Sequence, residues 1–385
     1  MTKKLNIAMV AACPFPANRG TQSRILRMAE AVSELGHGVF VVTYHFGTDT
    51  TTNLDIQRIP RVPYENFSPG PTMIKLAILD PLLFAKLLRV VRSKKIDLIH
   101  AHHFEGALIG YMVRKLTGIK VIYDAHTTLE GELASYSFIR MKVLEQFLDK
   151  NVPKWADHVI AVSETLEAFF RGNGVENVDV IPTGVNSDHF EGADQNAIRD
   201  RYKLNGKLIV MYTGSMASFQ GVEYLIEAMR RVFEKRQDVV LFLVTNSSAE
   251  SYEKIFSKKD IADRIIIASD QPYHDVPLFL ASADVVVNPR IECPGMPQKL
   301  TNYMAARKAI VSFEGSAKLL ENNVNGLVVE NGNTAAMADS IITLLENREY
   351  REKLGENARS AVIGRYDWKI LCQRIEEIYF KLLGL

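Results

Sequence analysis

The chain has 385 residues, of which 47% are hydrophobic and 24% charged, and its formal net charge at pH 7 is +1. These values are typical of a globular protein with two domains, and they exclude an extended disordered binder. The balanced charge argues against bulk nucleic-acid binding, and three scattered cysteines argue against a disulfide framework or a zinc site and indicate a reducing, cytoplasmic environment.

The first apolar stretch, residues 5–13, follows Lys3 and Lys4 and loosely resembles a signal peptide. It is short, rich in strand-forming residues and interrupted by Asn6, so we favour a buried first strand. No window of about 18 apolar residues lacks a charge, so the sequence predicts no transmembrane helix.

In the first half of the chain, short apolar runs alternate with longer segments of helical period. The predicted strands are 7–12, 38–44, 98–101, 120–124 and 158–162. The predicted helices are 23–35, 81–93, 107–117, 138–151 and 164–172. Continuous runs of Val, Ile and Leu indicate strands buried on both faces, which are typical of parallel sheets covered by helices.

The same alternation restarts after about residue 186. The predicted strands are 208–212, 239–244, 264–267, 284–289, 309–312 and 326–329, and the predicted helices are 222–234, 276–281, 299–306 and 334–346. Because the restart resembles the start, we predict an α/β fold with two Rossmann-like, doubly wound parallel-sheet domains facing across a cleft. The predicted domains are 1–185 and 186–367.

Three loops lead from a predicted strand into a helix and so offer free backbone N–H groups to an anion: 14–20, 214–221 and 290–298. None carries a three-glycine dinucleotide fingerprint or a Walker loop. Their glycines therefore fit simple turns as well as a phosphate site.

The loop 290–298 carries the most chemistry. The carboxylate of Glu292 can bind sugar hydroxyls. Backbone N–H groups of Gly295 and Met296, together with the Lys299 ammonium, can hold phosphate. Groups for a sugar and for a phosphate are thus expected at one strand end.

Eight short motifs follow one another along the chain: 159–164, 180–186, 212–214, 220–221, 225–228, 283–289, 295–300 and 303–305. In this order they resemble the retaining GT-B glycosyltransferases of the family usually numbered four (glycosyl transferases group 1). The resemblance implies a hexosyltransferase that moves a sugar, with retention, from a UDP- or GDP-sugar to a glycan, lipid or small-molecule acceptor. It also implies no cofactor, no required metal ion, and a helix at 368–385 that packs back on the N-terminal domain.

The loop 214–221, which corresponds to the phosphate loop of the resembling family, departs from the family pattern at two positions. Members commonly have Arg after the first glycine and Lys before the second, where this chain has Ser215 and Gln220. Losing two charged hydrogen bonds would weaken donor binding about 10²- to 10⁴-fold. We expect Lys299 and Arg290 to replace the missing cations, helped by the helix N-terminus after Gly221.

A second departure concerns an acid that often follows the glutamate at position 292. The corresponding residue here is Leu300 or, in a related arrangement, Asn302, which can still bind ribose hydroxyls. The predicted catalytic residues are Glu292, His126 and Lys299. The predicted donor-binding residues are Gly214, Ser215, Gln220, Gly221, Arg290, Gly295, Met296, Pro297, Asn302 and Gly20.

Two sites in the N-terminal half allow two interpretations each. The family places a histidine where this chain has His126, which implies contact with the transferred sugar; a satisfied strand-end histidine is the alternative. For Arg19 and Gly20, contact with acceptor or phosphate and simple turn chemistry both stay open.

A group of histidines invites a metal hypothesis, because His100 and His102 share one strand face and His103 follows them. No carboxylate cluster or cysteine pair in the sequence completes such a site. We therefore predict no metal site.

Residues 75–95 contain six basic residues against Asp80 alone. Asp80 and Pro81 are the expected N-cap and first position of a helix. At about 1 kcal/mol per basic residue, this helix would hold the protein on the inner face of an anionic membrane. The alternative is an amphipathic helix that packs on the sheet and leaves its bases in water.

Two other functions stay open. A nucleotide-sugar epimerase or hydrolase would need an acid/base cluster, for which Asp124, His126 and Glu130 are the candidates. A catalytically weakened, non-enzymatic relative is suggested by the departures in the phosphate loop and at Leu300.

Overall fold

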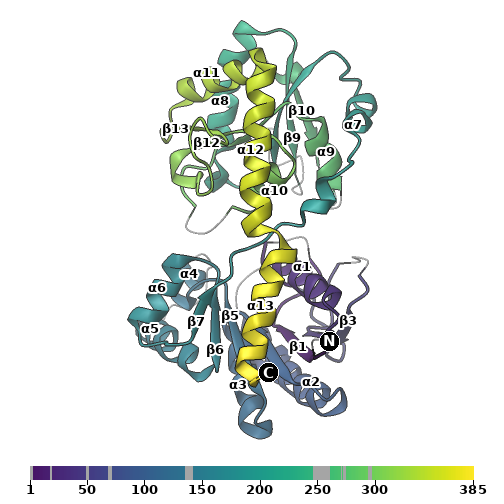
Figure 1. The fold of residues 1–385 in the computed structure, drawn as a ribbon, viewed down its shortest axis with the longest axis vertical. Helices are drawn as coiled ribbons and strands as arrows, with labels where there is room; N and C mark the ends of the chain where they lie inside the picture. Colours follow the sequence, from purple (N-terminus) through teal and green to yellow (C-terminus); the bar gives the residue numbers. More distant parts are fainter. Residues whose placement is uncertain are drawn as a thin grey trace. The chain divides into compact units, whose positions relative to one another are not determined.

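The computed structural model describes residues 3–17, 20–48, 52–67, 72–134, 142–245, 261–269, 271, 275–293 and 297–385. The chain forms two compact units (Figure 1). Unit 1 comprises Met1–Thr183 together with Trp368–Leu385, and unit 2 comprises Gly184–Asp367. The division falls between residues 183 and 184, against the predicted boundary between 185 and 186.

Unit 1 is built on a seven-stranded parallel sheet in the order β3-β2-β1-β4-β5-β6-β7. Its strands are β1 (Asn6–Ala11), β2 (Gly38–Thr43), β3 (Asp55–Arg58), β4 (Leu98–His102), β5 (Lys120–Ala125), β6 (His158–Ala161) and β7 (Val178–Val180). The chain order reverses between β1 and β4. Their carboxyl ends are therefore the topological switch point of a Rossmann-like sheet, where ligands of such folds bind.

Helices cover both faces of this sheet. The helical elements of unit 1 are α1 (Gly20–Glu34), η1 (Lys75–Leu79), α2 (Asp80–Ser93), α3 (His103–Thr117), α4 (Leu129–Ala134), α5 (Lys142–Asn151), η2 (Val152–Trp155), α6 (Glu164–Gly172) and α13 (Trp368–Leu383). Alternate residues of β1 point to opposite faces: Ile7 and Met9 pack with α1 and α13, whereas Ala8 and Val10 pack with α2 and α3.

Unit 2 repeats the design with a six-stranded parallel sheet in the order β10-β9-β8-β11-β12-β13. Its strands are β8 (Leu208–Thr213), β9 (Val239–Val244), β10 (Ile265–Ala268), β11 (Val285–Asn288), β12 (Ala309–Phe313) and β13 (Leu327–Val329). Its helical elements are η3 (Ser187–Phe190), α7 (Gln195–Arg201), η4 (Ser218–Gln220), α8 (Val222–Lys235), η6 (Ala262–Arg264), α9 (Val276–Ser282), α10 (Gln298–Ala305), η8 (Glu314–Ser316), α11 (Thr334–Glu346) and α12 (Arg348–Tyr366).

The predicted fold class, two Rossmann-like domains with parallel sheets, is confirmed. Several elements were not predicted: β3, β7, α4, α7 and α12. Strand β3 reads Asp-Ile-Gln-Arg and lies at the sheet edge with every residue partly exposed, so it lacks the apolar signal of a buried strand. The helix predicted over 138–151 begins at Lys142 within the described residues.

The predicted N-cap role of Asp80 is wrong. The helix begins earlier, in η1, and Asp80 has helical backbone angles inside it. Its carboxylate instead accepts a hydrogen bond from the Tyr44 hydroxyl at 2.6 Å. The local sequence suggested a helix cap, but the Asp80 carboxylate instead binds Tyr44, which is 36 positions away in the chain.

Candidate functional site

The phosphate loop of unit 2 requires two glycines for steric reasons. Gly214 follows β8 with φ +136°, and Gly221 precedes α8 with φ +71°. A Cβ at Gly221 would lie 2.2 Å from the carbonyl oxygen of Pro289, well inside contact distance. These glycines therefore let the loop after β8 approach the loop after β11, with the N-terminus of α8 at the junction.

Lys299, in the first turn of α10, reaches across to this loop. Its ammonium donates to the Tyr212 hydroxyl at 2.8 Å and to Gln220 Oε1 at 2.7 Å, and it lies 4.1 Å from the centre of the Tyr212 ring. Gln220 occupies the position where the family commonly has lysine. The structure thus places the Lys299 charge beside the site of the missing cation.

The ammonium of Lys299 is held in an unfavourable environment for a charge. Burial, and then the neighbouring Arg290, lower the pKa of Lys299 from 10.5 to about 7. A desolvated ammonium beside a guanidinium is prepared for an anionic ligand, because the ligand relieves both effects.

Arg290 and Glu292 lie in the loop that follows β11, and hydrogen bonds from buried polar side chains at the end of that strand hold this loop in place. Asn288 Nδ2 donates to Ser312 Oγ at 3.0 Å and to Ser316 Oγ at 2.9 Å, and the Ser316 hydroxyl donates to the Arg290 carbonyl. The Arg290 guanidinium lies over the Phe219 ring and donates to the carbonyl of Glu292. The side chain of Glu292 is exposed to solvent.

The remaining predicted donor-binding residues fall into different environments. Ser215 stabilises the turn itself, because its hydroxyl accepts from the Ala217 N–H at 3.2 Å. Pro297 is buried at the start of α10, and Asn302 is 4% exposed on the same helix. Gly295 and Met296 lie outside the described residues.

One anchor of α10 was not predicted. The Thr213 N–H donates to the Tyr303 hydroxyl at 2.8 Å, which ties α10 to the end of β8. Both residues belong to recognised motifs, but no local pattern reveals that they pair across 90 positions.

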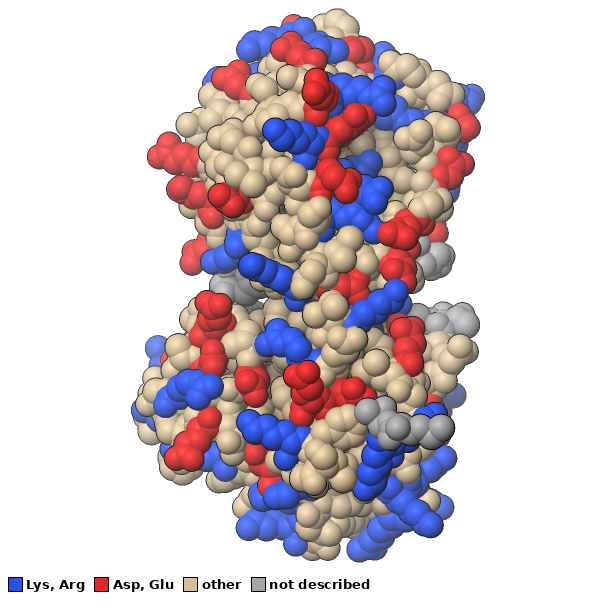
Figure 2. Space-filling model, in the orientation of Figure 1, with Lys and Arg blue, Asp and Glu red and all other residues tan. Residues whose placement is uncertain are grey.

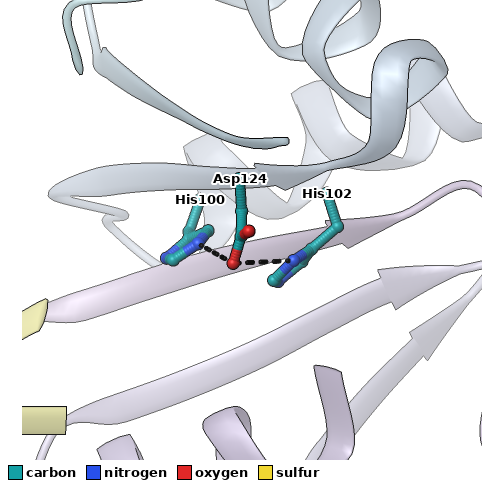
Figure 3. Close-up of side chains that lie close together, drawn as sticks. All are labelled: His100, His102 and Asp124. Atoms are coloured by element: carbon teal, nitrogen blue, oxygen red, sulfur yellow. Dashed lines mark hydrogen bonds and ion pairs between the residues drawn. The ribbon is translucent and has the colours of Figure 1, made fainter. Parts of the chain in front are cut away.

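A second cluster of predicted residues lies inside unit 1. The Arg24 guanidinium donates to both carboxylate oxygens of Asp124, at 3.2 and 3.1 Å. His100 Nε2 lies 3.4 Å and His102 Nδ1 lies 3.6 Å from Asp124 Oδ2, so the carboxylate sits between the two rings (Figure 3). His126 Nε2 is 3.7 Å from Asp124 Oδ1.

The sequence showed no carboxylate cluster beside these histidines, but the fold brings a single carboxylate, Asp124, to them. Asp124 on β5 is the register partner of His102 on β4, and the ligand atoms of Asp124, His100 and His102 lie within 4.8 Å of one another. However, both Asp124 oxygens bind Arg24, and His100 Nδ1 lies 2.6 Å from the Tyr379 hydroxyl. A cation here would meet a guanidinium, so the geometry favours a buried ion-pair network over a metal centre.

Burial sets the protonation states of this network. It lowers the pKa of His102 and of His126 well below the usual range. Burial alone would raise the pKa of Asp124, but Arg24 and the histidines hold it well below its usual value. At neutral pH Asp124 is therefore an anion, and the imidazoles of His102 and His126 are neutral.

The other residues predicted in the N-terminal half lie in different surroundings. His126 stacks on His103 with ring centres 4.7 Å apart and is nearly buried. Gly20 is the first residue of α1, and a Cβ there would meet open space, so its backbone does not require glycine. Arg19 lies outside the described residues. Glu130 accepts from Gln146 at 3.4 Å, and Asp124 is committed to Arg24, which weakens the acid/base cluster of an epimerase.

Two parallel Rossmann-like sheets, with a glycine loop and a cationic helix start at the strand ends of the second, are the architecture of the GT-B fold. Residues 194–361 match the family model described as "Glycosyl transferases group 1", and residues 18–189 match that described as "Glycosyltransferase Family 4". The chain belongs to this family of group 1, or family 4, glycosyltransferases.

Named relatives agree with this assignment. Over 303 residues the chain is 30% identical to an alpha-D-kanosaminyltransferase of Streptomyces kanamyceticus, covering 73% of this chain and 76% of that protein. It is 24% identical to a phosphatidyl-myo-inositol mannosyltransferase of Mycobacterium leprae over 97% of this chain and 96% of that one.

Solved structures share the fold. Sucrose-phosphate synthase from Thermosynechococcus elongatus superimposes with a TM-score of 0.79 at 19% identity, covering 99% of this chain and 100% of that one. Anabaena Alr3699/HepE, solved in complex with UDP and glucose, superimposes with a TM-score of 0.75 at 18% identity, over 97% and 99% of the two chains.

Proposed function

We propose that this glycosyltransferase is a retaining hexosyltransferase that takes its sugar from a UDP- or GDP-sugar without requiring a metal ion. The observation that carries the proposal is the Lys299 ammonium, 2.7 Å from Gln220 Oε1 in the loop that leads into α8. This ammonium lies beside a loop whose glycines allow close approach of the backbone, and the loop ends at a helix N-terminus. Such a combination is suited to binding a diphosphate. HepE, solved with UDP and glucose, has the same fold and supports a nucleotide-sugar donor.

Each predicted side chain has a separate role in this proposal. Lys299, Arg290 and the N-terminus of α8 neutralise the diphosphate, helped by the backbone N–H groups of Gly295 and Met296. Glu292 binds hydroxyls of the donor sugar. Asn302 faces the ribose. The acceptor is a glycan, a lipid or a small molecule.

The reaction needs no separate base in this proposal. The bond between the anomeric carbon and the diphosphate oxygen breaks while the acceptor oxygen bonds to the same face of that carbon. The acceptor proton passes to the leaving phosphate, so atoms and charge balance. The catalytic demand is then stabilisation of the leaving diphosphate, which a fixed cation meets best in a site that excludes water.

The direct test is a thermal-shift panel of UDP-, GDP- and ADP-sugars, followed by product analysis with candidate acceptors. A donor at 100 times its Kd should stabilise the protein by about 2.7 kcal/mol. Stabilisation with turnover supports the proposal, and stabilisation without turnover favours a non-enzymatic relative. If none of these nucleotides stabilises the protein, the donor proposal is wrong.

Donor affinity should depend on pH through Lys299, because a diphosphate prefers its ammonium form. With a pKa of about 7 in the folded protein, the ammonium is progressively lost above neutrality. The unfolded chain keeps this proton to higher pH, so the free protein gains stability from pH 7 upward while donor binding weakens. We expect affinity to fall by up to about 10-fold per pH unit above 7.

Isothermal titration with a nucleotide sugar from about pH 6.5 to 8.5 measures this effect. A nucleotide sugar is preferred to free UDP because its diphosphate lacks a terminal phosphate that titrates nearby. The Lys299→Ala variant serves as control and should show a flat profile. The same slope in both proteins would assign the pH dependence to another group.

A further inference from the structure

The outer face of one long helix in unit 1 has an unusual composition. Elements η1 and α2 form one continuous helical segment over residues 73–93, since Ile74, Leu79 and Asp80 at their junctions all have helical backbone angles. Its inner face packs Leu83 and Leu87, with neighbouring apolar residues, against the sheet beside α3. The outer face is left to solvent.

The first turns of this outer face are apolar. The exposed fractions are 69% for Met73, 39% for Ile74, 42% for Leu76 and 43% for Ile78. The outer face of a helix in a globular protein is usually polar, and adjacent exposed apolar side chains mark an interaction surface.

The last turns of the same face are basic. Arg89 and Arg92 are exposed, and with Phe84, Ala85, Leu88 and Ser93 they line a shallow apolar groove. Lysine and arginine side chains gather at the bottom of the view in Figure 2, where α2 and the end of α3 lie in Figure 1. The one acidic residue between 75 and 95, Asp80, is bonded to Tyr44.

We propose that the outer face of residues 73–93 docks on an anionic lipid bilayer, with the helix axis along the surface. Apolar side chains would enter the interfacial layer while Arg89 and Arg92 bind lipid phosphates. The part of the chain that the structure describes has no helix with the length and hydropathy needed to cross a bilayer, so this attachment would be peripheral. The inference concerns unit 1 alone and does not depend on the donor proposed for unit 2.

The chemistry of the face favours a bilayer over other polyanions. Nucleic acid offers phosphates but no apolar layer for Met73, Leu76 and Ile78. Each basic side chain near an anionic bilayer strengthens binding about 5-fold, so Arg89 and Arg92 together should contribute about 25-fold.

The experiment is co-sedimentation of the full chain with vesicles of phosphatidylcholine alone or mixed with phosphatidylglycerol. We expect binding that rises with phosphatidylglycerol content and weakens with salt. The variant Arg89→Glu/Arg92→Glu should lose at least about 25-fold in partition coefficient. Ile78→Asn should weaken binding about equally at low and high salt, because it removes an apolar contact.

A matched control reverses two exposed bases of unit 2, Arg231→Glu/Lys353→Glu, which change the net charge equally. An equal loss in this control would overturn the proposal, since net charge would explain it. Absence of binding to phosphatidylglycerol vesicles at low salt would also overturn it. So would a dimer in sedimentation equilibrium that Ile78→Asn dissociates without any effect on vesicles, because the face would then bind a second copy.

Thermal unfolding checks that the variants fold. Substitutions at exposed positions away from caps and networks usually change stability by less than about 0.5 kcal/mol, so unchanged unfolding is expected for all of them. A variant that keeps its unfolding temperature and loses vesicle binding supports a docking role.

Discussion

Replacing Lys299 with alanine should lower kcat for sugar transfer by about 10²- to 10³-fold, the usual effect of removing one donor that stabilises a developing anion. The ammonium lies 2.7 Å from Gln220 Oε1 and 2.8 Å from the Tyr212 hydroxyl, at the junction of two loops. Glu292→Gln should cost less, and chiefly in donor affinity, because that side chain is exposed and binds sugar hydroxyls in the proposed site. Steady-state kinetics with the donor found by the nucleotide panel measure both. Equal activity of the two variants would contradict these roles.

The chain offers a rescue variant for this prediction. Gln220 occupies the family's lysine position and already contacts Lys299. In the double variant Lys299→Ala/Gln220→Lys, an ammonium returns to the loop from the other side, and we expect at least about 10-fold recovery of kcat. Failure to recover, with donor binding intact, would indicate that Lys299 acts by holding the loop rather than by carrying charge.

Replacing Arg24 with methionine should destabilise unit 1 by about 3–5 kcal/mol, because the change leaves the Asp124 carboxylate buried without its counter-charge. Arg24 and Asp124 side chains are 1% and 0% exposed. Urea unfolding followed by tryptophan fluorescence is a specific measurement, since the two tryptophans of the chain, Trp155 and Trp368, both lie in unit 1. A loss below about 1 kcal/mol would mean that the carboxylate is not charged in the folded protein.

A double variant and a pH series sharpen the interpretation. Arg24→Met/Asp124→Leu removes both charges and should be more stable than Arg24→Met alone. In the wild-type protein the pKa of Asp124 is held well below its usual value, so the pair stabilises the folded state above about pH 4 and loses this effect as pH falls. In Arg24→Met that acid-side loss should disappear, because protonation then relieves an unpaired buried charge.

The sequence predicted the features that depend on short-range patterns. Strand β11, for example, is a run of three valines and an asparagine, all buried, and it was predicted from this apolar run alone. Strand β3 was missed because an edge strand exposed on every residue carries no such pattern. The long helix α12 was missed because its sequence is rich in charged residues and only a few of its side chains are buried.

In the candidate site, too, contacts that follow from sequence motifs were predicted, and contacts between distant segments were not. The placement of Lys299 beside the phosphate loop follows from the order of motifs and a missing lysine. The partners of Asp124 follow from no local signal: Arg24 is 100 positions away, and Tyr379 lies 279 positions from His100. Such pairs arise only when the topology brings distant segments together, so a single sequence contains no spacing that reveals them.

The helix α13 has a consequence for biosynthesis. Its side chains Trp368, Leu371, Ile375 and Tyr379 belong to the same buried cluster as strand β1 and helix α1. A ribosome makes all of unit 2 before it makes this helix, so the first domain to be translated is the last whose core is filled. Unit 2 can therefore complete its own fold while unit 1 still exposes an apolar face, the reverse of the usual order in which domains fold as they emerge.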